Sequence, residues 1–174
     1  SLSSQGREML DIISIEIQRL EKTTQHYLDL SRRKEPTIER WSPLDAINEL
    51  LQFESTHLAV FFEVTGDQQM ALIDIDIFRR SLRNLIRNAI EANAEHISFQ
   101  VISQPSDIAV IVQDDGDGMA QFQKDAAFDL FFTTKSTGTG LGLAICRQEL
   151  ESFGASIGLL SSKEGTCFQL TLPR

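Results

Sequence analysis

The spacing of hydrophobic positions divides this chain into an N-terminal helical stretch and a longer segment in which strands and helices alternate. From Arg7 to Arg33 there is no proline or glycine, and apolar or small residues recur at alternating steps of three and four. This spacing predicts one long helix with a coiled-coil-like seam for a partner helix, although the period alone equally allows the stripe to pack on its own domain. The seam consists of Leu10, Ile13, Ile17, Leu20, Thr24, Tyr27 and Ser31.

The helical pattern ends at Lys34-Glu35-Pro36, because proline cannot continue a helix. We place a domain boundary there, with residues 1–36 before it and residues 37–174 after it.

Short runs rich in β-branched and aromatic residues predict the next strands. Residues 38–41 form the first of them, and Pro43 then begins a short helix that Ser42 caps. Residues 58–65 and 70–73 are predicted to form an antiparallel pair, with a turn between them that begins at a glycine.

A long helix is predicted over residues 76–92, because Phe78, Leu82, Leu85 and Ala89 form one apolar stripe at helical spacing. Further strands are predicted at 97–103, 108–114, 155–161 and 166–172, and a further helix at 141–153. Helices combined with strands that are mostly joined as hairpins predict an α/β two-layer sandwich.

Composition and charge restrict the function. Hydrophobic residues make up 41% of the chain and charged residues 24%, which is ordinary for a soluble globular protein. The net charge of −9 and the pI of about 4.8 argue against a nucleic-acid or membrane-surface binder, so phosphate recognition would be local. The absence of a long apolar run predicts a cytoplasmic domain. Cys146 and Cys167 lack metal-ligand spacing and are interpreted as reduced core thiols.

Two glycine motifs predict the two ends of a nucleotide pocket. Asp114-Asp115-Gly116-Asp117-Gly118 follows an apolar run, so Asp114 lies where a buried strand ends and its carboxylate can accept a hydrogen bond, whereas Asp115 and Asp117 are interpreted as turn carboxylates. Gly138-Thr139-Gly140-Leu141-Gly142-Leu143 opens a helix, where free N–H groups and the helix dipole favour phosphate. A Gly-x-Gly alone is usually a turn, and the spacing fits neither the dinucleotide motif nor the P-loop.

Two more motifs give these glycines a context. Asn84 to Ala92 lies on the long predicted helix, and Phe128 to Lys135 lies between the glycine motifs. In this order the four motifs resemble the N box, D-x-G-x-G box, F box and second glycine box of the GHKL superfamily of ATP-binding domains. The likeness extends from about Leu10 to Pro173 and is strongest to the catalytic domain of bacterial sensor histidine kinases of the nitrogen-regulator type. It implies a Bergerat-type fold with a mixed sheet, preceded by the coiled-coil-like helix.

The resemblance implies that ATP and Mg²⁺ are the cofactors. It assigns the adenine amine to Asp114, with Gly116 and Gly118 allowing the backbone to approach the base. It assigns the phosphates to the second glycine box, through Thr139, Gly140, Leu141, Gly142 and Leu143.

Asn84 and Asn88 lie one helical turn apart on the same face of the predicted helix. Most asparagines on helices are ordinary surface residues. The resemblance places the side-chain oxygen of Asn88 on Mg²⁺, which takes few protein ligands beside phosphate and water oxygens. Asn84 stands where hydrolysing relatives carry a water-activating glutamate. Because an amide cannot act as a general base, the chain is predicted to hold ATP for transfer.

Residues 119–137 correspond to the family's ATP lid and are predicted to form a loop that is too long for a passive connection. Its aromatic residues are expected to fold back or to dock on a partner; they are Phe128, Phe131 and Phe132. Lys135 is the lid cation best placed to reach the terminal phosphate, and Arg87 is a weaker candidate for the same role.

One family element is missing, because no His-Glu-x-x-x-Pro phosphoacceptor box occurs. Residues 1–36 resemble only the second helix of the dimerisation and phosphotransfer hairpin. His26, His57 and His96 are interpreted as surface or boundary histidines. The expected partners are a hairpin that carries the phosphoacceptor histidine, a response regulator receiver domain and a second copy in the full-length homodimer, with no nucleic acid.

We therefore predict a histidine kinase catalytic domain that transfers the γ-phosphoryl group of Mg·ATP to a histidine outside this chain, and that is inactive in autophosphorylation on its own. The first alternative is a serine kinase or ATPase switch of the same superfamily, which Asn84 and the F box disfavour. The second is a non-catalytic nucleotide-binding or phosphotransfer module, against which the intact motifs argue.

Overall fold

The computed structural model describes part of the N-terminal helix and nearly all of the predicted catalytic domain. The described residues are 9–10, 13–14, 17, 35–54, 59–135 and 138–174. They divide into two compact units, residues 36–126 with 146–174 and residues 1–35 with 127–145. Met9, Leu10, Ile13, Ser14 and Ile17 are α-helical. The rest of the predicted seam lies outside the described residues, as do His26 and His57, and the boundary after residue 36 stays a prediction.

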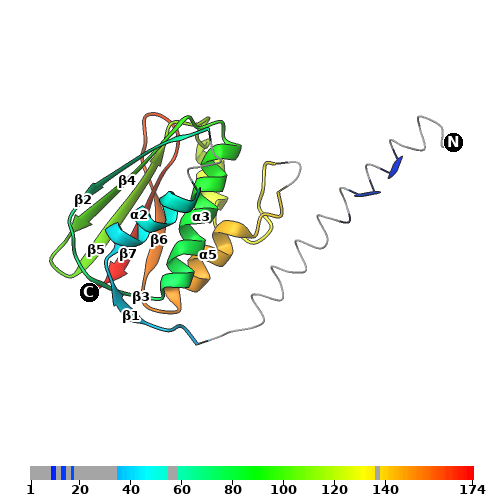
Figure 1. The fold of residues 1–174 in the computed structure, drawn as a ribbon. Helices are drawn as coiled ribbons and strands as arrows, with labels where there is room; N and C mark the ends of the chain where they lie inside the picture. The colour runs from blue at the N-terminus through cyan, green and yellow to red at the C-terminus, as the bar shows by residue number, and fades with distance from the viewer. Residues whose placement is uncertain (1–8, 11–12, 15–16, 18–34, 55–58, 136–137) are drawn as a thin grey trace. The chain divides into compact units, whose positions relative to one another are not determined.

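The larger unit is built on a mixed five-stranded sheet (Figure 1). Its order is β2 (Phe61–Gly66), β4 (His96–Ser103), β5 (Asp107–Asp114), β7 (Cys167–Pro173) and β6 (Ser156–Leu160). Only the pair of β2 and β4 is parallel, and the other neighbours are antiparallel. The β4–β5 and β6–β7 hairpins confirm the pairing predicted for these strands. Apolar residues alternate along β4, so one face of the sheet is buried and the other is open.

The predicted antiparallel pair between residues 58–65 and 70–73 is wrong. The second segment forms β3 (Ala71–Ile73), which pairs with β1 (Glu39–Trp41) in a separate two-stranded sheet, and the first forms β2 beside β4. The chain does not fold back after β2 because the next residue, Asp67, remains bonded to β4: its N–H donates to the carbonyl oxygen of Val101 over 2.9 Å. Distant pairing therefore prevails over the nearest partner in sequence.

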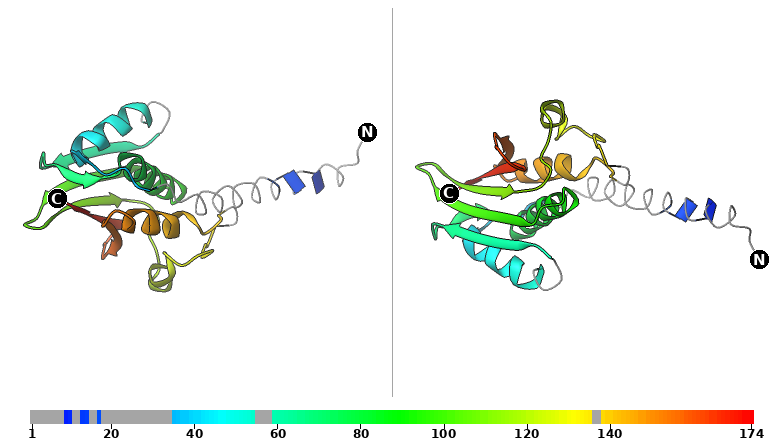
Figure 2. Two further views of the ribbon diagram at one scale, coloured as in Figure 1. Left: turned by 90° about the horizontal axis from the view of Figure 1, so that it is seen from below. Right: turned by 90° about the horizontal axis from the view of Figure 1, so that it is seen from above.

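Three helices cover the buried face of the sheet, which confirms the two-layer sandwich (Figures 1 and 2). They are α2 (Pro43–Glu54), α3 (Ile75–Glu91) and the second half of α5 (Gly142–Glu151). The predicted stripe of α3 is buried, with Phe78 and Leu82 at 0% exposure. Each such side chain contributes about 1.5–3 kcal/mol of hydrophobic stabilisation. No helix in the described part of the chain is long and apolar enough to cross a membrane.

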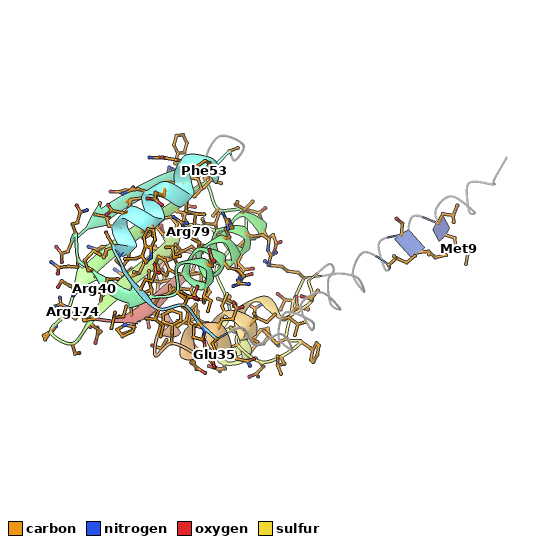
Figure 3. All side chains as sticks on the ribbon, turned by 60° about the horizontal axis from the view of Figure 1, so that its bottom comes forward. Met9, Glu35, Arg40, Phe53, Arg79 and Arg174 are labelled. Atoms are coloured by element: carbon orange, nitrogen blue, oxygen red, sulfur yellow. The ribbon has the colours of Figure 1, made fainter. Side chains whose placement is uncertain are left out.

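The ends and flanks of the helices are held by polar contacts. Ser42 Oγ accepts the N–H of Asp45 (3.2 Å), which confirms the predicted cap of α2. Asp74 caps α3, because its Oδ1 accepts the N–H groups of both Asp76 and Ile77. Arg79 lies on α3 (Figure 3). It pairs with Glu49 of α2 and lies 5.8 Å from the centre of the Trp41 ring. These contacts set the position of α3, the helix that carries Asn84 and Asn88.

Candidate functional site

Asp114 is the last residue of β5, and its side chain lies on the helix-covered face with 6% exposure. Its Oδ1 accepts two backbone N–H groups, from Gly116 and from Thr166, each over 3.0 Å. Among the described residues nothing donates to Oδ2, which leaves this oxygen as an acceptor for a ligand. Burial raises the pKa of the carboxyl above 3.8, and the two N–H donors act in the opposite direction. The site thus presents a fixed, poorly hydrated acceptor.

The turn between β6 and β7 packs directly against this carboxylate. Gly165 has a φ of +59°, and a Cβ there would lie 1.9 Å from the carbonyl oxygen of Asp114. A Cβ at Gly118 would lie 2.9 Å from the carbonyl oxygen of Gly165. Residue 165 must therefore be glycine, both for its backbone conformation and for the close approach of the turn. Sequence reasoning did not link Gly165 and Thr166 to the site, because nothing local connects them to Asp114, which Thr166 follows by 52 positions.

The other two aspartates of the motif hold the surrounding backbone, in keeping with their predicted role as turn carboxylates. Asp115 Oδ1 accepts the N–H groups of Glu95 and His96 over 2.8 and 2.9 Å. Asp115 Oδ2 lies 2.9 Å from Nδ1 of the exposed His96 ring, and these contacts with His96 lower the pKa of Asp115. Asp117 accepts the side-chain amide of Asn93 over 2.8 Å, and its N–H donates to the carbonyl oxygen of Ala92. The motif is thereby attached to the end of α3.

The two asparagines of α3 have different surroundings. Asn84 is engaged at both ends of its amide: Oδ1 accepts from the Arg87 guanidinium over 2.6 Å, and Nδ2 donates to Cys146 Sγ over 3.4 Å. Asn88, one turn further along, is partly exposed, and among the described residues its side chain has no hydrogen-bond partner. Its amide oxygen therefore has no described donor, and it lies near the end of α3, to which the Asp114 motif is attached.

A magnesium ion at this position would need nucleotide oxygens. Within the described ranges no cluster of three or more His, Cys, Asp or Glu side chains could hold a metal. Mg²⁺ is commonly held at nucleotide sites by one or two protein oxygens together with phosphate and water oxygens. The single amide oxygen of Asn88 fits such a shared site.

Both cysteines are free and buried, as predicted for core thiols. Burial is the main cause that raises the pKa of Cys146 to about 11, and the nearby charge of Glu149 acts in the same direction. Burial also raises the pKa of Cys167. Neither thiol has the low pKa of a nucleophile.

In the smaller unit, the F box and the second glycine box are joined at their backbones. The N–H of Phe131 donates to the carbonyl oxygen of Gly140 over 3.0 Å, and both residues have a φ of +66°. A Cβ at Gly140 would lie 2.3 Å from the carbonyl carbon of Phe131. Lys135 lies between these two residues in sequence, and its N–H donates to Thr133 Oγ1 over 3.1 Å. The backbone bond between Phe131 and Gly140 therefore closes the segment of the lid region that carries Lys135.

The lid region is more ordered than a loop. Residues 119–137 were expected to lack secondary structure, but Gln121–Ala126 form a short helix, α4. Phe131 is 65% exposed, whereas Phe128 and Phe132 are partly covered. Gly142, the last glycine of the second glycine box, is the first residue of α5, which confirms that the box lies at the start of a helix.

The structure therefore brings the predicted residues together in two groups. The larger unit gathers Asp114, Gly116 and Gly118 at the end of the helix that carries Asn88. The smaller unit holds Lys135 together with the run from Thr139 to Leu143. The binding roles of these residues remain predictions.

Comparison with known proteins finds sensor histidine kinases among the relatives of this chain. A family profile described as histidine kinase-, DNA gyrase B-, and HSP90-like ATPase matches residues 73–174. The sensor histidine kinase ZraS of Escherichia coli (strain K12) is 29% identical over 177 residues, which cover 97% of this chain and 38% of ZraS. The sensor protein TdiS of Thauera aromatica is 37% identical over 101 residues, which cover 53% of this chain and 18% of TdiS. The chain thus spans well under half of these relatives.

Solved structures show the same fold. The catalytic domain of the histidine kinase ThkA matches with a TM-score of 0.69 and 28% identity, covering 79% of this chain and 95% of that domain. A structure of ThkA in complex with the response regulator protein TrrA matches with a TM-score of 0.77 at 24% identity, covering 99% of this chain and 52% of that one.

Proposed function

Because this chain belongs to the family of histidine kinase-, DNA gyrase B- and HSP90-like ATPases, we propose that it transfers the γ-phosphoryl group of ATP to a histidine outside the chain. It is the catalytic ATP-binding domain of a two-component sensor histidine kinase. The observation that carries the proposal is the Asp114 carboxylate, which is buried and fixed at one oxygen by two backbone donors while its other oxygen has no described donor. Such an acceptor suits the exocyclic amine of adenine.

The remaining residues bind and position the phosphates. Asn88 would hold Mg²⁺ through its amide oxygen, and the ion would neutralise charge on the phosphate oxygens when bound. Backbone N–H groups from Thr139 to Leu143 precede or begin α5, where helix N-termini favour phosphate, and Lys135 would reach the terminal phosphate. Catalysis then consists of positioning and charge stabilisation, because the imidazole of the acceptor is itself the nucleophile.

The surroundings of Asn84 support transfer over hydrolysis. Its amide is bonded to Arg87 and Cys146, and an amide cannot deprotonate water. We therefore propose that the chain alone neither phosphorylates itself nor releases phosphate at an appreciable rate. The exposed His96 ring is engaged with Asp115 and is not the proposed acceptor.

The partners of this chain are inferred from its relatives. Residues 1–36 would be the second helix of a dimerisation hairpin, and the full-length protein would form a homodimer. A response regulator receiver domain would take the phosphoryl group from the histidine, as the complex of ThkA with the response regulator TrrA suggests.

The test is incubation with γ-labelled ATP, with and without a separately produced dimerisation hairpin from the full-length protein. Acid-labile label should appear on the hairpin only in the mixture, and the Asp114→Asn variant should transfer much less of it. Label on this chain alone would contradict the proposed external acceptor. Brisk phosphate release without a hairpin would identify an ATPase instead.

A further inference from the structure

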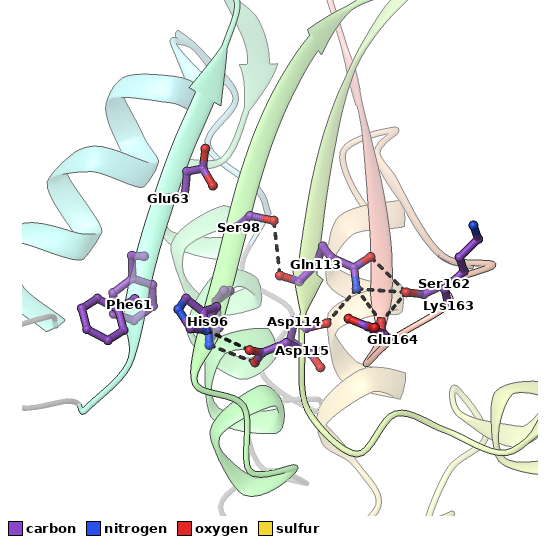
Figure 4. Close-up of a pocket in the computed structure, with 12 residues that line it drawn as sticks. Phe61, Glu63, His96, Ser98, Gln113, Asp114, Asp115, Ser162, Lys163 and Glu164 are labelled. Carbon is purple, nitrogen blue, oxygen red and sulfur yellow. Dashed lines mark hydrogen bonds and ion pairs between the residues drawn. The ribbon is translucent and has the colours of Figure 1, made fainter.

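The open face of the sheet carries a cavity whose lining includes Asp114, the proposed adenine acceptor, and Asp115. It has a volume of about 590 Å³, and its walls come from the ends of β2, β4 and β5 and from the β6–β7 turn (Figure 4). Phe61 and His96 stack at one side of it, with ring centres 5.3 Å apart, and Gln113 lies at the other side beside Ser162 and Glu164. Asn84, Asn88 and the second glycine box do not line it. Gln113 precedes Asp114 on β5, so its side chain projects on the opposite face of the sheet from the Asp114 side chain.

The Gln113 side chain joins β5 to the β6–β7 turn. Its Nε2 lies within hydrogen-bond distance of three acceptors: the carbonyl oxygens of Asp114 (2.7 Å) and Glu164 (2.8 Å) and the hydroxyl of Ser162 (3.0 Å). Ser162 Oγ in turn donates to the carbonyl oxygen of Glu164. The orientation of the amide is forced, because the reverse orientation would place Oε1 against two carbonyl oxygens that can only accept. We call the contacts of the Gln113 amide with Asp114, Ser162 and Glu164 the Gln113 clasp.

The turn held by the clasp is the one that fixes Asp114 from the other face. Thr166, two residues after Glu164, donates its N–H to Asp114 Oδ1, and Gly165 packs on the backbone of Asp114. The clasp also bonds the carbonyl oxygen of Asp114 itself, which restrains the peptide group that follows the carboxylate. The Gln113 clasp thus acts on the same turn as the Thr166 donor, beside the backbone bond from the Asp114 N–H to the Thr166 carbonyl oxygen (2.9 Å).

We propose that Gln113 is a positioning residue that sets the adenine specificity of the site from the opposite face of the sheet. This inference rests on the proposed role of Asp114 in binding adenine. Without the clasp, the turn moves away from β5, the Thr166 donor leaves Oδ1, and the carboxylate no longer holds one orientation toward the base. Binding of adenine weakens, and the preference over guanine falls with it.

Gln113 is open to this test because its side chain lies outside the core. It projects on the open face and is part of the cavity wall, so its replacement leaves the packing between sheet and helices intact. The variant Gln113→Leu keeps a similar size without donors, and Gln113→Glu replaces the donor by an oxygen that repels both carbonyl groups. Gln169→Leu is a matched control. Gln169 lies on β7 and on the same face of the sheet as Gln113, but its described side-chain bond is to Thr171 and not to the β6–β7 turn.

The experiment uses the whole chain and two measurements. Hydrogen exchange of residues 161–167 without nucleotide should be faster in both Gln113 variants than in the parent and in Gln169→Leu. Calorimetric titration with ATP and GTP should show an ATP preference reduced about three- to tenfold, the effect of losing one or two net hydrogen bonds.

Unchanged exchange in the Gln113 variants would overturn the clasp. Faster exchange with an unchanged ATP preference would overturn the positioning role, provided that Asp114→Asn lowers that preference. If Asp114→Asn leaves the preference intact, the adenine assignment itself fails, and the positioning role fails with it.

Discussion

The backbone N–H of Thr166 donates to Oδ1 of Asp114 over 3.0 Å, across 52 positions of sequence. The bond joins the start of the last strand to the end of the strand that carries the proposed adenine acceptor. Because the N–H of Gly116 donates to the same oxygen, Asp114 is held by a local and by a distant donor. The carboxylate therefore keeps its orientation before any nucleotide binds.

Asp114→Asn should weaken binding of every adenine nucleotide and reduce the preference for ATP over GTP. The variant keeps the size of the side chain but loses the charged acceptor, and a hydrogen bond to a charged group is worth about 1.5–3 kcal/mol, or roughly tenfold or more in affinity. Calorimetry with ATP, ADP and GTP measures the effect. A variant that prefers ATP as strongly as the parent would contradict the assignment.

Nucleotide binding should be sensitive to acid, because the pKa of Asp114 is raised above 3.8, mainly by burial. The ionised carboxylate accepts the hydrogen bond of the adenine amine more strongly than the protonated carboxyl does, so ATP affinity should fall as the pH is lowered through a range above 3.8. In Asp114→Asn this fall should be absent. The measurement is ATP affinity against pH for both proteins, and parallel curves would argue against ionised Asp114 as the acceptor.

The raised pKa of Asp114 also makes the stability of the fold depend on pH, and this dependence has the opposite sign to that of ATP affinity. With a raised folded-state pKa, the contribution of Asp114 to stability is fully present below 3.8 and is lost as the pH rises through the folded value. The pKa of Asp115 is lowered by the His96 backbone and ring, so its contribution is present above 3.8 and is lost as the pH falls through the lowered value. Denaturant unfolding of Asp114→Asn should lack the first of these changes.

Asn88→Ala should weaken binding of Mg·ATP much more than binding of metal-free ADP, because the lost oxygen is the proposed magnesium ligand. We expect a loss of about tenfold or more for Mg·ATP, comparable to one hydrogen bond to a charged group. Gln100→Ala, an exposed change on β4, is the control. Equal losses for the two ligands would rule out a metal role for Asn88.

Gly140→Ala should open the lid contact between Phe131 and Gly140. The added Cβ would clash with the Phe131 carbonyl carbon at 2.3 Å, and a φ of +66° costs an alanine about 1–2 kcal/mol. In the parent, hydrogen exchange of residues 127–135 should slow with a non-hydrolysable ATP analogue and slow less with ADP, because the terminal phosphate contacts the lid. Gly140→Ala should lose most of this difference. Identical protection by both nucleotides in the parent would contradict a lid that responds to the γ-phosphate.

Neither cysteine should react with iodoacetamide in the folded protein near neutral pH. The pKa of Cys146 is raised to about 11, and both thiols are buried, so the thiolate is scarce and shielded. Mass spectrometry should find both cysteines modified after denaturation and neither before it. Rapid native labelling of Cys146 would show that α5 opens away from Asn84.

Local patterns were sufficient to identify most elements of the catalytic domain. The stripe of Phe78, Leu82, Leu85 and Ala89 predicted α3, because a helix repeats its buried face at a period that sequence displays directly. The Ser42 cap and the hairpin strands were found for the same reason: each depends on neighbours a few residues away. The four motifs likewise identified the family, because each occupies a short segment in a defined order.

Tertiary structure decided which of these segments meet. The partner of β2 is β4 and not the nearby β3, because strand pairing depends on hydrogen bonds and burial that no local period records. The same holds for Thr166 and Gly165 against Asp114, and for Gln113 across the sheet. Sequence alone could nominate Asp114 as an acceptor, but its burial, its raised pKa and its two donors arise only when segments far apart in the chain exclude water from it together.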